Sequence, residues 1–185
     1  MFWTNLAVTL LALVLAVLLR DWRNRCRRPV IYIVQGFLAA GKTTYSKQLA
    51  AKTGALRLNA DEYCAGNFTQ GQLDADWESC FAAAVAALWQ VAEAQVKSGN
   101  SVILDFGFWD RASRDHARAR AAEWKAKASL VYLDVPADVL LERLKTRTSA
   151  VAERNRANFH EIKKHFQPPQ PDEHAVVIRE DVGVR

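Results

Sequence analysis

Short apolar runs alternate with longer amphipathic stretches along most of this chain. Five runs of four to six mainly apolar residues have the length and boundaries of buried strands. They cover residues 29–34, 55–59, 101–105, 130–135 and 175–178. Between them, apolar side chains recur every three or four residues, which is the spacing of a helix with one buried face. The alternation predicts an α/β fold in which helices cover both faces of a parallel sheet.

The longest predicted helix runs from Asp76 to Lys97. Its apolar side chains recur with helical spacing, and we interpret them as core residues without a role in cofactor binding: Trp77, Phe81, Val85, Leu88, Ala92 and Val96. An earlier helix covers residues 45–52 and ends at Gly54, because glycine readily takes the left-handed conformation that follows a helix. Residues 63–75 contain two glycines and are expected to form a loop.

Two further helices are predicted in the second half of the chain. One covers residues 111–128, with Asp110 as its cap, and its outer face is expected to carry a solvated basic stripe of Arg111, Arg114, Arg118 and Lys125. The other begins at Pro136, a residue that suits the first turn of a helix. Residues 148–165 are polar and alternately charged, which is compatible with a lid, and a rigid proline-rich loop follows at residues 166–173.

The N-terminal segment differs from the rest in composition. Residues 2–19 carry no charge and are mainly apolar, and their 18 positions are at the short end of the range for a membrane span. Five arginines follow at once and no Lys or Arg precedes, so the positive-inside rule places the remaining chain in the cytoplasm. We therefore predict a single-pass anchor in the inner membrane with a basic juxtamembrane segment, residues 1–28, and one cytoplasmic domain, residues 29–185.

The alternative interpretation of this segment concerns the start of translation. A start placed too far upstream would add a non-native leader to a domain that begins near Pro29, and the protein would then be cytoplasmic. Met1 is the only methionine, so a downstream start would need a non-AUG codon.

The net charge of +5 is concentrated in the segment that follows the apolar run. Five arginines and one aspartate in residues 20–28 account for four of these charges, which leaves the rest of the chain near neutral. Nothing in this distribution indicates a nucleic-acid groove. The three cysteines form no C-x-x-C pair and are expected to be reduced thiols, and the spacing of His160 and His165 does not fit a zinc site, so we expect no metal site made of protein ligands alone.

Residues 36–44 carry the strongest chemical signal, because they fit the phosphate-binding pattern G-x-x-x-x-G-K-[ST] between a strand and a helix. The backbone of such a loop points successive N–H groups at a phosphate, Lys42 reaches the outer phosphates, and Thr43 is a magnesium ligand. The alternative is a purely structural glycine-rich turn. The predicted nucleotide-binding residues are Gly36, Ala39, Ala40, Gly41, Lys42, Thr43 and Thr44.

Asp105 ends an apolar strand, where phosphate-loop proteins place a second magnesium-binding acid, although an aspartate in a strand-end turn is the alternative. The adjoining D-F-G triplet does not indicate a protein kinase, since no H-R-D loop is present. Arg111 follows this strand and is a candidate contact for an anionic substrate. Arg143 and Arg147 share a helix face and are candidates to neutralise a transferring phosphate, with exposed surface arginines as the alternative.

The order of these motifs resembles the bacterial P-loop ATP-binding proteins grouped as AAA-type domain 33. That group is similar to chloramphenicol phosphotransferase, zeta toxin and other small kinases with the nucleoside-monophosphate-kinase-like fold. The resemblance covers about residues 30–180 and implies a five-stranded parallel sheet that uses ATP and Mg²⁺. The runs that carry it are residues 36–44, 59–62, 102–111, 132–136, 141–144 and 168–173.

The resemblance also implies that Asp61 is the general base that takes the proton of a substrate hydroxyl, with a helix-capping role as the alternative. The chain departs from the pattern after Arg147, where no glycine-rich lid motif follows, so Arg154 or Arg156 are further candidates for the lid arginine. A membrane anchor is not part of the family pattern.

Together these features predict an ATP-dependent phosphotransferase that acts on a hydroxyl of a small molecule. The catalytic residues would be Lys42, Asp61, Arg143 and Arg147; magnesium would lie at Thr43 and Asp105, and the acceptor at Asp61 and Arg111. One alternative is a membrane-tethered nucleotide switch or regulatory ATPase, and a weaker one is a zeta-type toxin that phosphorylates a nucleotide sugar. The loops expected to bind the acceptor, residues 61–75 and 108–115, do not reveal its identity.

Overall fold

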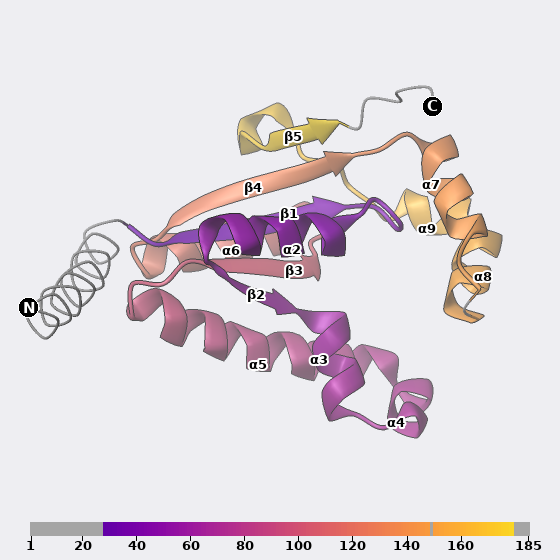
Figure 1. Cartoon of the computed structure of the whole chain (residues 1–185), viewed down its shortest axis with the longest axis horizontal. Helices are drawn as coiled ribbons and strands as arrows, with labels where there is room; N and C mark the ends of the chain where they lie inside the picture. Colours follow the sequence, from indigo (N-terminus) through magenta and orange to yellow (C-terminus); the bar gives the residue numbers. More distant parts are fainter. Residues whose placement is uncertain (1–27, 149, 180–185) are drawn as a thin grey trace, which may run out of the picture.

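Five parallel strands form the centre of the computed structural model, which describes residues 28–148 and 150–179 (Figure 1). The strand order is β2-β3-β1-β4-β5, and every neighbouring pair is parallel. This confirms the predicted sheet, whereas the predicted membrane helix at residues 2–19 lies outside the described residues. The strands are β1 (Val30–Gly36), β2 (Leu56–Asn59), β3 (Val102–Gly107), β4 (Lys127–Asp134) and β5 (Val176–Arg179).

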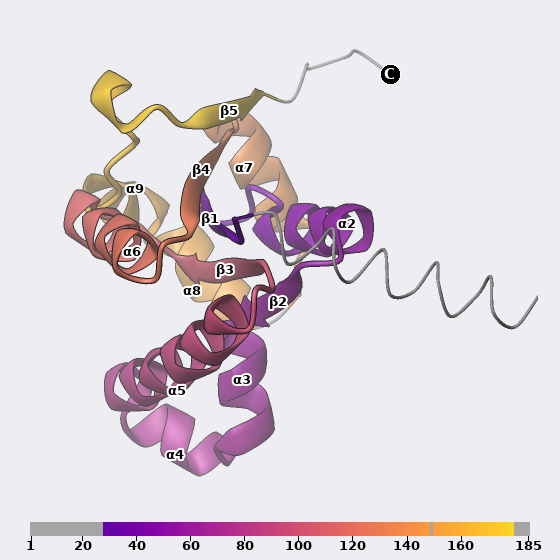
Figure 2. The ribbon, with the colours of Figure 1, turned by 90° about the vertical axis from the view of Figure 1, so that its left-hand side faces the viewer.

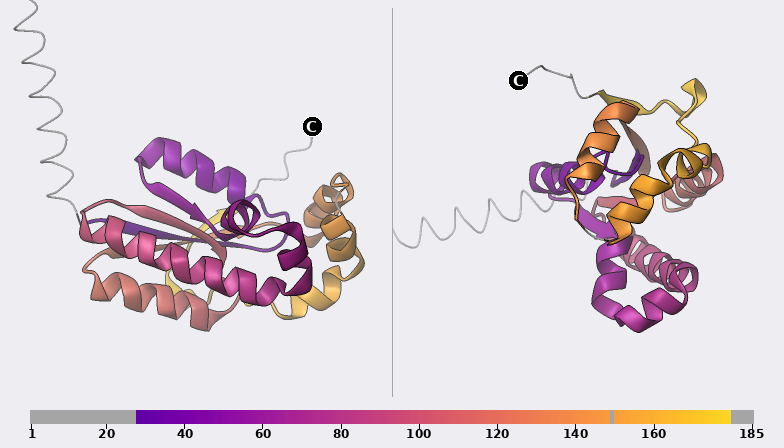
Figure 3. Two further views of the ribbon diagram at one scale, coloured as in Figure 1. Left: turned by 90° about the horizontal axis from the view of Figure 1, so that it is seen from below. Right: turned by 90° about the vertical axis from the view of Figure 1, so that its right-hand side faces the viewer.

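Helices cover both faces of the sheet, with α2 on one face and α5 and α6 on the other (Figure 2). The short helices α8 and α9 gather near the carboxyl ends of the strands, close to α7 (Figure 3). The described helices are α2 (Lys42–Thr53), α3 (Ala60–Asn67), α4 (Gln70–Ala75), α5 (Trp77–Lys97), α6 (Arg111–Glu123), α7 (Ala137–Lys145), α8 (Ala150–Ala157) and α9 (Phe159–Lys164).

The segment predicted as a loop, residues 63–75, is instead largely helical, because two polar side chains cap the helices within it. Asn59 accepts a hydrogen bond from the N–H of Glu62 at 2.7 Å and so begins α3. Thr69 and Gln72 form a capping box at the start of α4. The predicted helix over residues 111–128 was also too long, since α6 ends at Glu123 and β4 begins at Lys127.

Helix α5 is the one described helix that is long and apolar enough, by length and composition, to cross a membrane. In the C-terminal half of α5 the apolar side chains are core residues, because Leu88, Ala92 and Val96 are buried against the sheet. Its N-terminal half is different. Trp77 is 46% exposed and Phe81 is only partly buried, so the predicted apolar stripe is core along part of its length only.

The sheet order sets the position of the functional site. Strand β1 pairs with β3 on one side and with β4 on the other. The chain runs from β1 to β2 at one edge of the sheet, whereas from β3 it crosses β1 to reach β4 on the opposite side. The connections therefore leave β1 and β3 in opposite directions, which is the topological switch point where α/β sheets bind ligands. This arrangement places the loop after β1 beside the acidic end of β3.

The packing around Gly36, at the end of β1, gives a testable prediction about stability. A Cβ atom there would lie 3.0 Å from the Cβ of Ala40 and 3.1 Å from the Cβ of Leu133. Gly36→Ala is therefore expected to lower the unfolding free energy by about 1–3 kcal/mol in urea denaturation, because the loop and β4 must move apart. Gly71→Ala is the control: nothing lies within 4 Å, and the change should stabilise α4. Equal stability of both variants would contradict this interpretation.

Candidate active site

The loop between β1 and α2 has the geometry of a phosphate cradle. Ala39 and Gly41 both take positive φ angles, 61° and 91°, which curl the backbone ahead of the helix. No described side chain caps the N-terminus of α2, and its first turn holds no acidic residue. The free N–H groups and the positive end of the helix dipole therefore suit a phosphate.

Lys42 lies inside this loop, where its Nζ donates to the carbonyl oxygens of Gly36, at 2.9 Å, and Phe37, at 3.0 Å. Burial lowers the pKa of Lys42, while the carboxylates of Asp105 and Asp61 act in the opposite direction. A partly desolvated ammonium beside a ring of backbone N–H groups is suited to bind the outer phosphates of a nucleotide.

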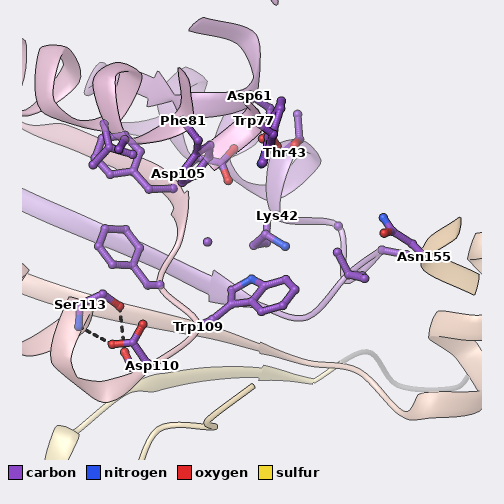
Figure 4. A pocket seen from close by; sticks show the side chains of 18 of the residues that line it. Lys42, Thr43, Asp61, Trp77, Phe81, Asp105, Trp109, Asp110, Ser113 and Asn155 are labelled. Atoms are coloured by element: carbon purple, nitrogen blue, oxygen red, sulfur yellow. Dashed lines mark hydrogen bonds between the residues drawn. The ribbon is translucent and has the colours of Figure 1, made fainter. Parts of the chain in front are cut away.

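Asp105 is held at the carboxyl end of β3 by two residues that the sequence interpretation did not identify. Its Oδ2 accepts from Asn59 Nδ2 at 2.8 Å and from Arg57 Nη2 at 3.2 Å. Asn59 is the register partner of Asp105 in the pairing of β2 with β3, so both lie at the same edge of the sheet. The buried Asp105 carboxylate is thus held in place, and it lines the same pocket as Thr43 (Figure 4). A carboxylate and a hydroxyl are groups that could hold a Mg²⁺ ion whose other ligands come from water and phosphate.

Asp61 lies in the first turn of α3 and lines the same pocket. The capping role weighed for it belongs to Asn59, whose side chain accepts the hydrogen bond of the helix start. Desolvation by the surrounding protein raises the pKa of Asp61, and Asp105 and Glu62 raise it further, while Lys42 opposes them. The position and the raised pKa are those of a carboxylate that can accept a proton.

One pocket of about 1150 Å³ contains these groups (Figure 4). Lys42, Thr43, Thr44, Asp61 and Asp105 line it, together with residues of α5, the segment after β3, and α8. The pocket thus joins the phosphate loop, the predicted base and the predicted magnesium ligands in a single space.

The arginines of α7 and of the segment after it occupy different positions. Arg147 and Arg154 line the pocket. Arg143 contacts the phosphate loop instead, because its Nη1 donates to the carbonyl of Ala39 at 3.2 Å. Arg156 donates to the carbonyl of Leu144 at the end of α7. The structure therefore brings Arg147 and Arg154 to the pocket, while Arg143 braces the loop.

Arg111, predicted as a substrate contact, is not among the residues that line the pocket. Its guanidinium pairs with Asp172, with Nη2 2.5 Å from Oδ2, and with Asp115 on its own helix. The expectation that Arg111 faces an anionic substrate therefore does not fit this geometry.

The predicted solvated stripe on α6 is wrong at Arg114, which is fully buried. Its Nε and Nη2 donate to the two oxygens of Glu173, at 2.8 and 2.7 Å, and its Nη1 donates to the Gln167 carbonyl at 2.9 Å. The bonds that Glu173 accepts from Arg114, together with those from the N–H of Gln170 and from Arg118, lower its pKa to about 2. The sequence signal was the Asp172-Glu173 pair after the prolines, which supplies partners for Arg111 and Arg114.

Gln167 connects this network to the site. Its carbonyl also accepts from Gln35 Nε2, at 2.8 Å, and its N–H donates to the carbonyl of Trp109. The segment that follows α9 is thereby fixed to β1 and to the pocket wall at the same point.

The raised pKa of Asp61 predicts how catalysis depends on pH. A base must be deprotonated to accept a proton, so if Asp61 is the base, activity should fall as the pH drops through the pKa of Asp61. Since desolvation places this pKa above the ordinary aspartate value, the decline should begin at a higher pH than for an unperturbed aspartate. A profile of kcat against pH at saturating ATP measures it. A flat profile down to the pH at which the protein unfolds would contradict the assignment.

Comparisons with known proteins show the family and the fold of this chain. A family model described as AAA domain (AAA_33) matches residues 31–169. No curated protein matches the chain. A solved structure of a putative kinase from Chloroflexus aurantiacus is 22% identical, with a TM-score of 0.61, and the match covers 84% of this chain and 86% of the other.

Two further solved structures are of named kinases. The APS kinase of Mycobacterium tuberculosis, solved with AMPPNP and APS, is 19% identical, with a TM-score of 0.59 over 83% of this chain and 90% of the other. A gluconokinase from Sinorhizobium meliloti is 17% identical, with a TM-score of 0.57 over 83% and 84%. Similarities at this level establish the fold that these proteins share.

Proposed function

Because the chain belongs to the AAA domain family whose model spans residues 31–169, we propose that it transfers the γ-phosphoryl group of ATP to a hydroxyl of a small molecule. The observation that carries the proposal is the convergence of Lys42, Asp61 and Asp105 on one pocket. A phosphate cradle alone would serve any nucleotide-binding protein. A desolvated carboxylate beside it is what an acceptor hydroxyl requires.

In this mechanism the loop N–H groups and Lys42 bind the β- and γ-phosphates. Asp61 accepts the proton of the acceptor hydroxyl. The hydroxyl oxygen forms a bond to the γ-phosphorus as the bond between that phosphorus and the β–γ bridging oxygen breaks, and ADP leaves. Arg147 and Arg154 lie where they can offset charge on the phosphoryl oxygens, and Arg143 keeps the loop in shape. Thr43 and Asp105 would hold Mg²⁺, which neutralises phosphate charge when bound.

The kinases of similar fold support this reaction type, as their names include a sugar kinase, a gluconokinase and an APS kinase. The finer resemblance to chloramphenicol phosphotransferase and zeta toxin rests on the order of motifs in the sequence, and it remains part of the proposal.

The test is incubation of the full-length protein with ATP, Mg²⁺ and a metabolite pool, followed by mass spectrometry. A new phosphate ester that is absent without protein, and absent when AMPPNP replaces ATP, would support the proposal and identify the acceptor. Tight ATP binding without product across a broad pool would instead favour a nucleotide switch or a regulatory ATPase.

We also propose that residues 2–19 anchor this domain in the inner membrane with the active site in the cytoplasm. The support is the uncharged apolar run followed by five arginines. Fractionation tests it: the full chain should sediment with membranes and resist carbonate extraction, whereas soluble full-length protein would favour a cytoplasmic enzyme with a misplaced start.

A further inference from the structure

The pocket has two chemically different sides. The phosphate loop, two carboxylates and two arginines form one side, while the other is largely aromatic. Its rings come from α5, from the end of β3 and from the segment that follows β3: Trp77, Phe81, Trp89, Phe106, Phe108 and Trp109. Half of the α5 stripe interpreted from the sequence as core is thus the wall of a ligand pocket.

The aromatic side is preformed, because its rings hold one another in place. Trp77 stacks on Phe81 with ring centroids 5.8 Å apart, and Phe106 stacks on Phe108 at 5.7 Å. Trp89 of α5 connects the rings of this helix to those of the segment around Phe106, since it packs edge-on against Phe106 with ring centroids 5.9 Å apart. Fixed rings bind an apolar ligand with little loss of conformational entropy.

The backbone after β3 is shaped to present these rings. Gly107 and Phe108 both take positive φ angles, 99° and 48°, and the second is unusual for a bulky side chain. The turn brings Trp109 back over Gly107, where an added Cβ would lie 3.2 Å from the indole Cδ1. Trp109 also packs against Phe37 of the phosphate loop, at 5.6 Å, so the aromatic wall continues to the loop.

The charges around this wall do not suit an anion. The Lys and Arg residues that line the pocket are Lys42, Arg147 and Arg154, and they come from the phosphate loop, the end of α7 and α8. Asp61 and Asp110 line it as well. Arg111, the α6 residue that was the candidate contact for an anionic substrate, is paired with Asp172, and Arg114 is paired with Glu173. An anionic acceptor seated on the rings would therefore find no Lys or Arg on the lining of α5 or of the turn at residues 106–109, while Asp61 and Asp110 would repel it.

We propose that the acceptor is an uncharged alcohol with a flat, aromatic or similarly apolar body. The body packs between α5 and the turn at residues 106–109, and the hydroxyl lies at Asp61, which lines the same pocket. This inference rests on the proposed phosphotransferase function for the role of the hydroxyl. The preference for an uncharged ring follows from the aromatic wall and from the charged residues around it, and does not depend on the reaction.

The test uses the full-length protein and a neutral fluorescent ring probe, N-phenyl-1-naphthylamine. Trp77→Ala and Phe81→Ala are each expected to weaken probe binding about tenfold, since each removes one ring of the wall. Val91→Ala is the matched control, because Val91 is on the same helix, exposed, and outside the pocket. Phe81→Leu, which retains an apolar side chain, covers the case in which Phe81→Ala fails to fold. Unchanged binding in the ring variants would overturn the inference.

A matched pair of alcohols then tests charge. 2-Naphthalenemethanol should displace the probe at a concentration at least about tenfold lower than its 6-carboxylate analogue. Equal or better displacement by the carboxylate would overturn the inference. So would competitive displacement by ADP, because the rings would then hold the adenine base.

The two proposals fail in different ways. Phosphorylation of an anionic, ring-free acceptor from the metabolite pool would uphold the phosphotransferase and overturn the acceptor class. Tight binding of the neutral alcohol, lost in the ring variants, with no phosphate ester formed from any acceptor would uphold the ligand class and overturn the phosphotransferase.

Discussion

Asp61→Asn is expected to lower the rate of phosphoryl transfer by about 10²–10⁴-fold, with ATP affinity changed by no more than about twofold. Asparagine keeps the size and polarity of the side chain but cannot accept the hydroxyl proton. The pKa of Asp61 is raised mainly by desolvation, so the wild-type carboxylate is a better base than an exposed aspartate. The measurement is single-turnover transfer to the identified acceptor, with nucleotide affinity measured separately by calorimetry.

Lys42→Ala is the contrasting variant, because Lys42 lies within the phosphate cradle. It should lose nucleotide affinity and transfer together. If Asp61→Asn instead transfers phosphate at the wild-type rate, Asp61 is not the base, and the nucleotide-switch interpretation gains support. If Asp61→Asn loses ATP affinity as Lys42→Ala does, its role is in nucleotide binding.

The second large effect is on stability. Arg114→Met is expected to lower the unfolding free energy by about 3–5 kcal/mol, because it leaves the buried Glu173 without its bidentate partner. Arg111→Met on the same helix is the control, and it should have a much smaller effect because its pairs are exposed to solvent. Urea denaturation at neutral pH measures both changes.

The double variant Arg114→Met with Glu173→Gln separates the loss of the ion pair from the cost of leaving the Glu173 charge in the interior. It should recover part of the loss, since the buried Glu173 carboxylate, which in Arg114→Met retains Arg118 at 2.9 Å as its charged partner, is then replaced by a neutral amide. A loss in Arg114→Met no greater than that in Arg111→Met would show that the buried pair does not stabilise the fold.

The sheet and the phosphate loop were predictable because both are encoded locally. Strand runs are short and apolar, and the loop motif lies at fixed spacing between one strand and one helix. Asp105 followed from its place at the end of such a strand. The predicted nucleotide-binding and magnesium-binding roles of these residues are still predictions.

The sequence interpretation failed where the environment depends on contacts between distant segments. Arg114 has the helical spacing of an exposed stripe, and only the segment around Glu173 makes it a core residue. Trp77 and Phe81 share the period of Leu88, but the sheet extends far enough to bury only the C-terminal part of α5. Arg57 orients Asp105 across two strands, and a single sequence contains no signal for such a pair.

The pairing of Arg114 with Glu173 also has a consequence for the order in which the protein folds during synthesis. The two residues are 59 positions apart. At about 5–20 residues per second, roughly 3–12 s pass on the ribosome between them. During this interval α6 carries an unneutralised guanidinium that opposes its burial against the sheet. Docking of α6, and with it completion of the pocket wall at Trp109, therefore belongs to the last stage of folding of the nascent chain.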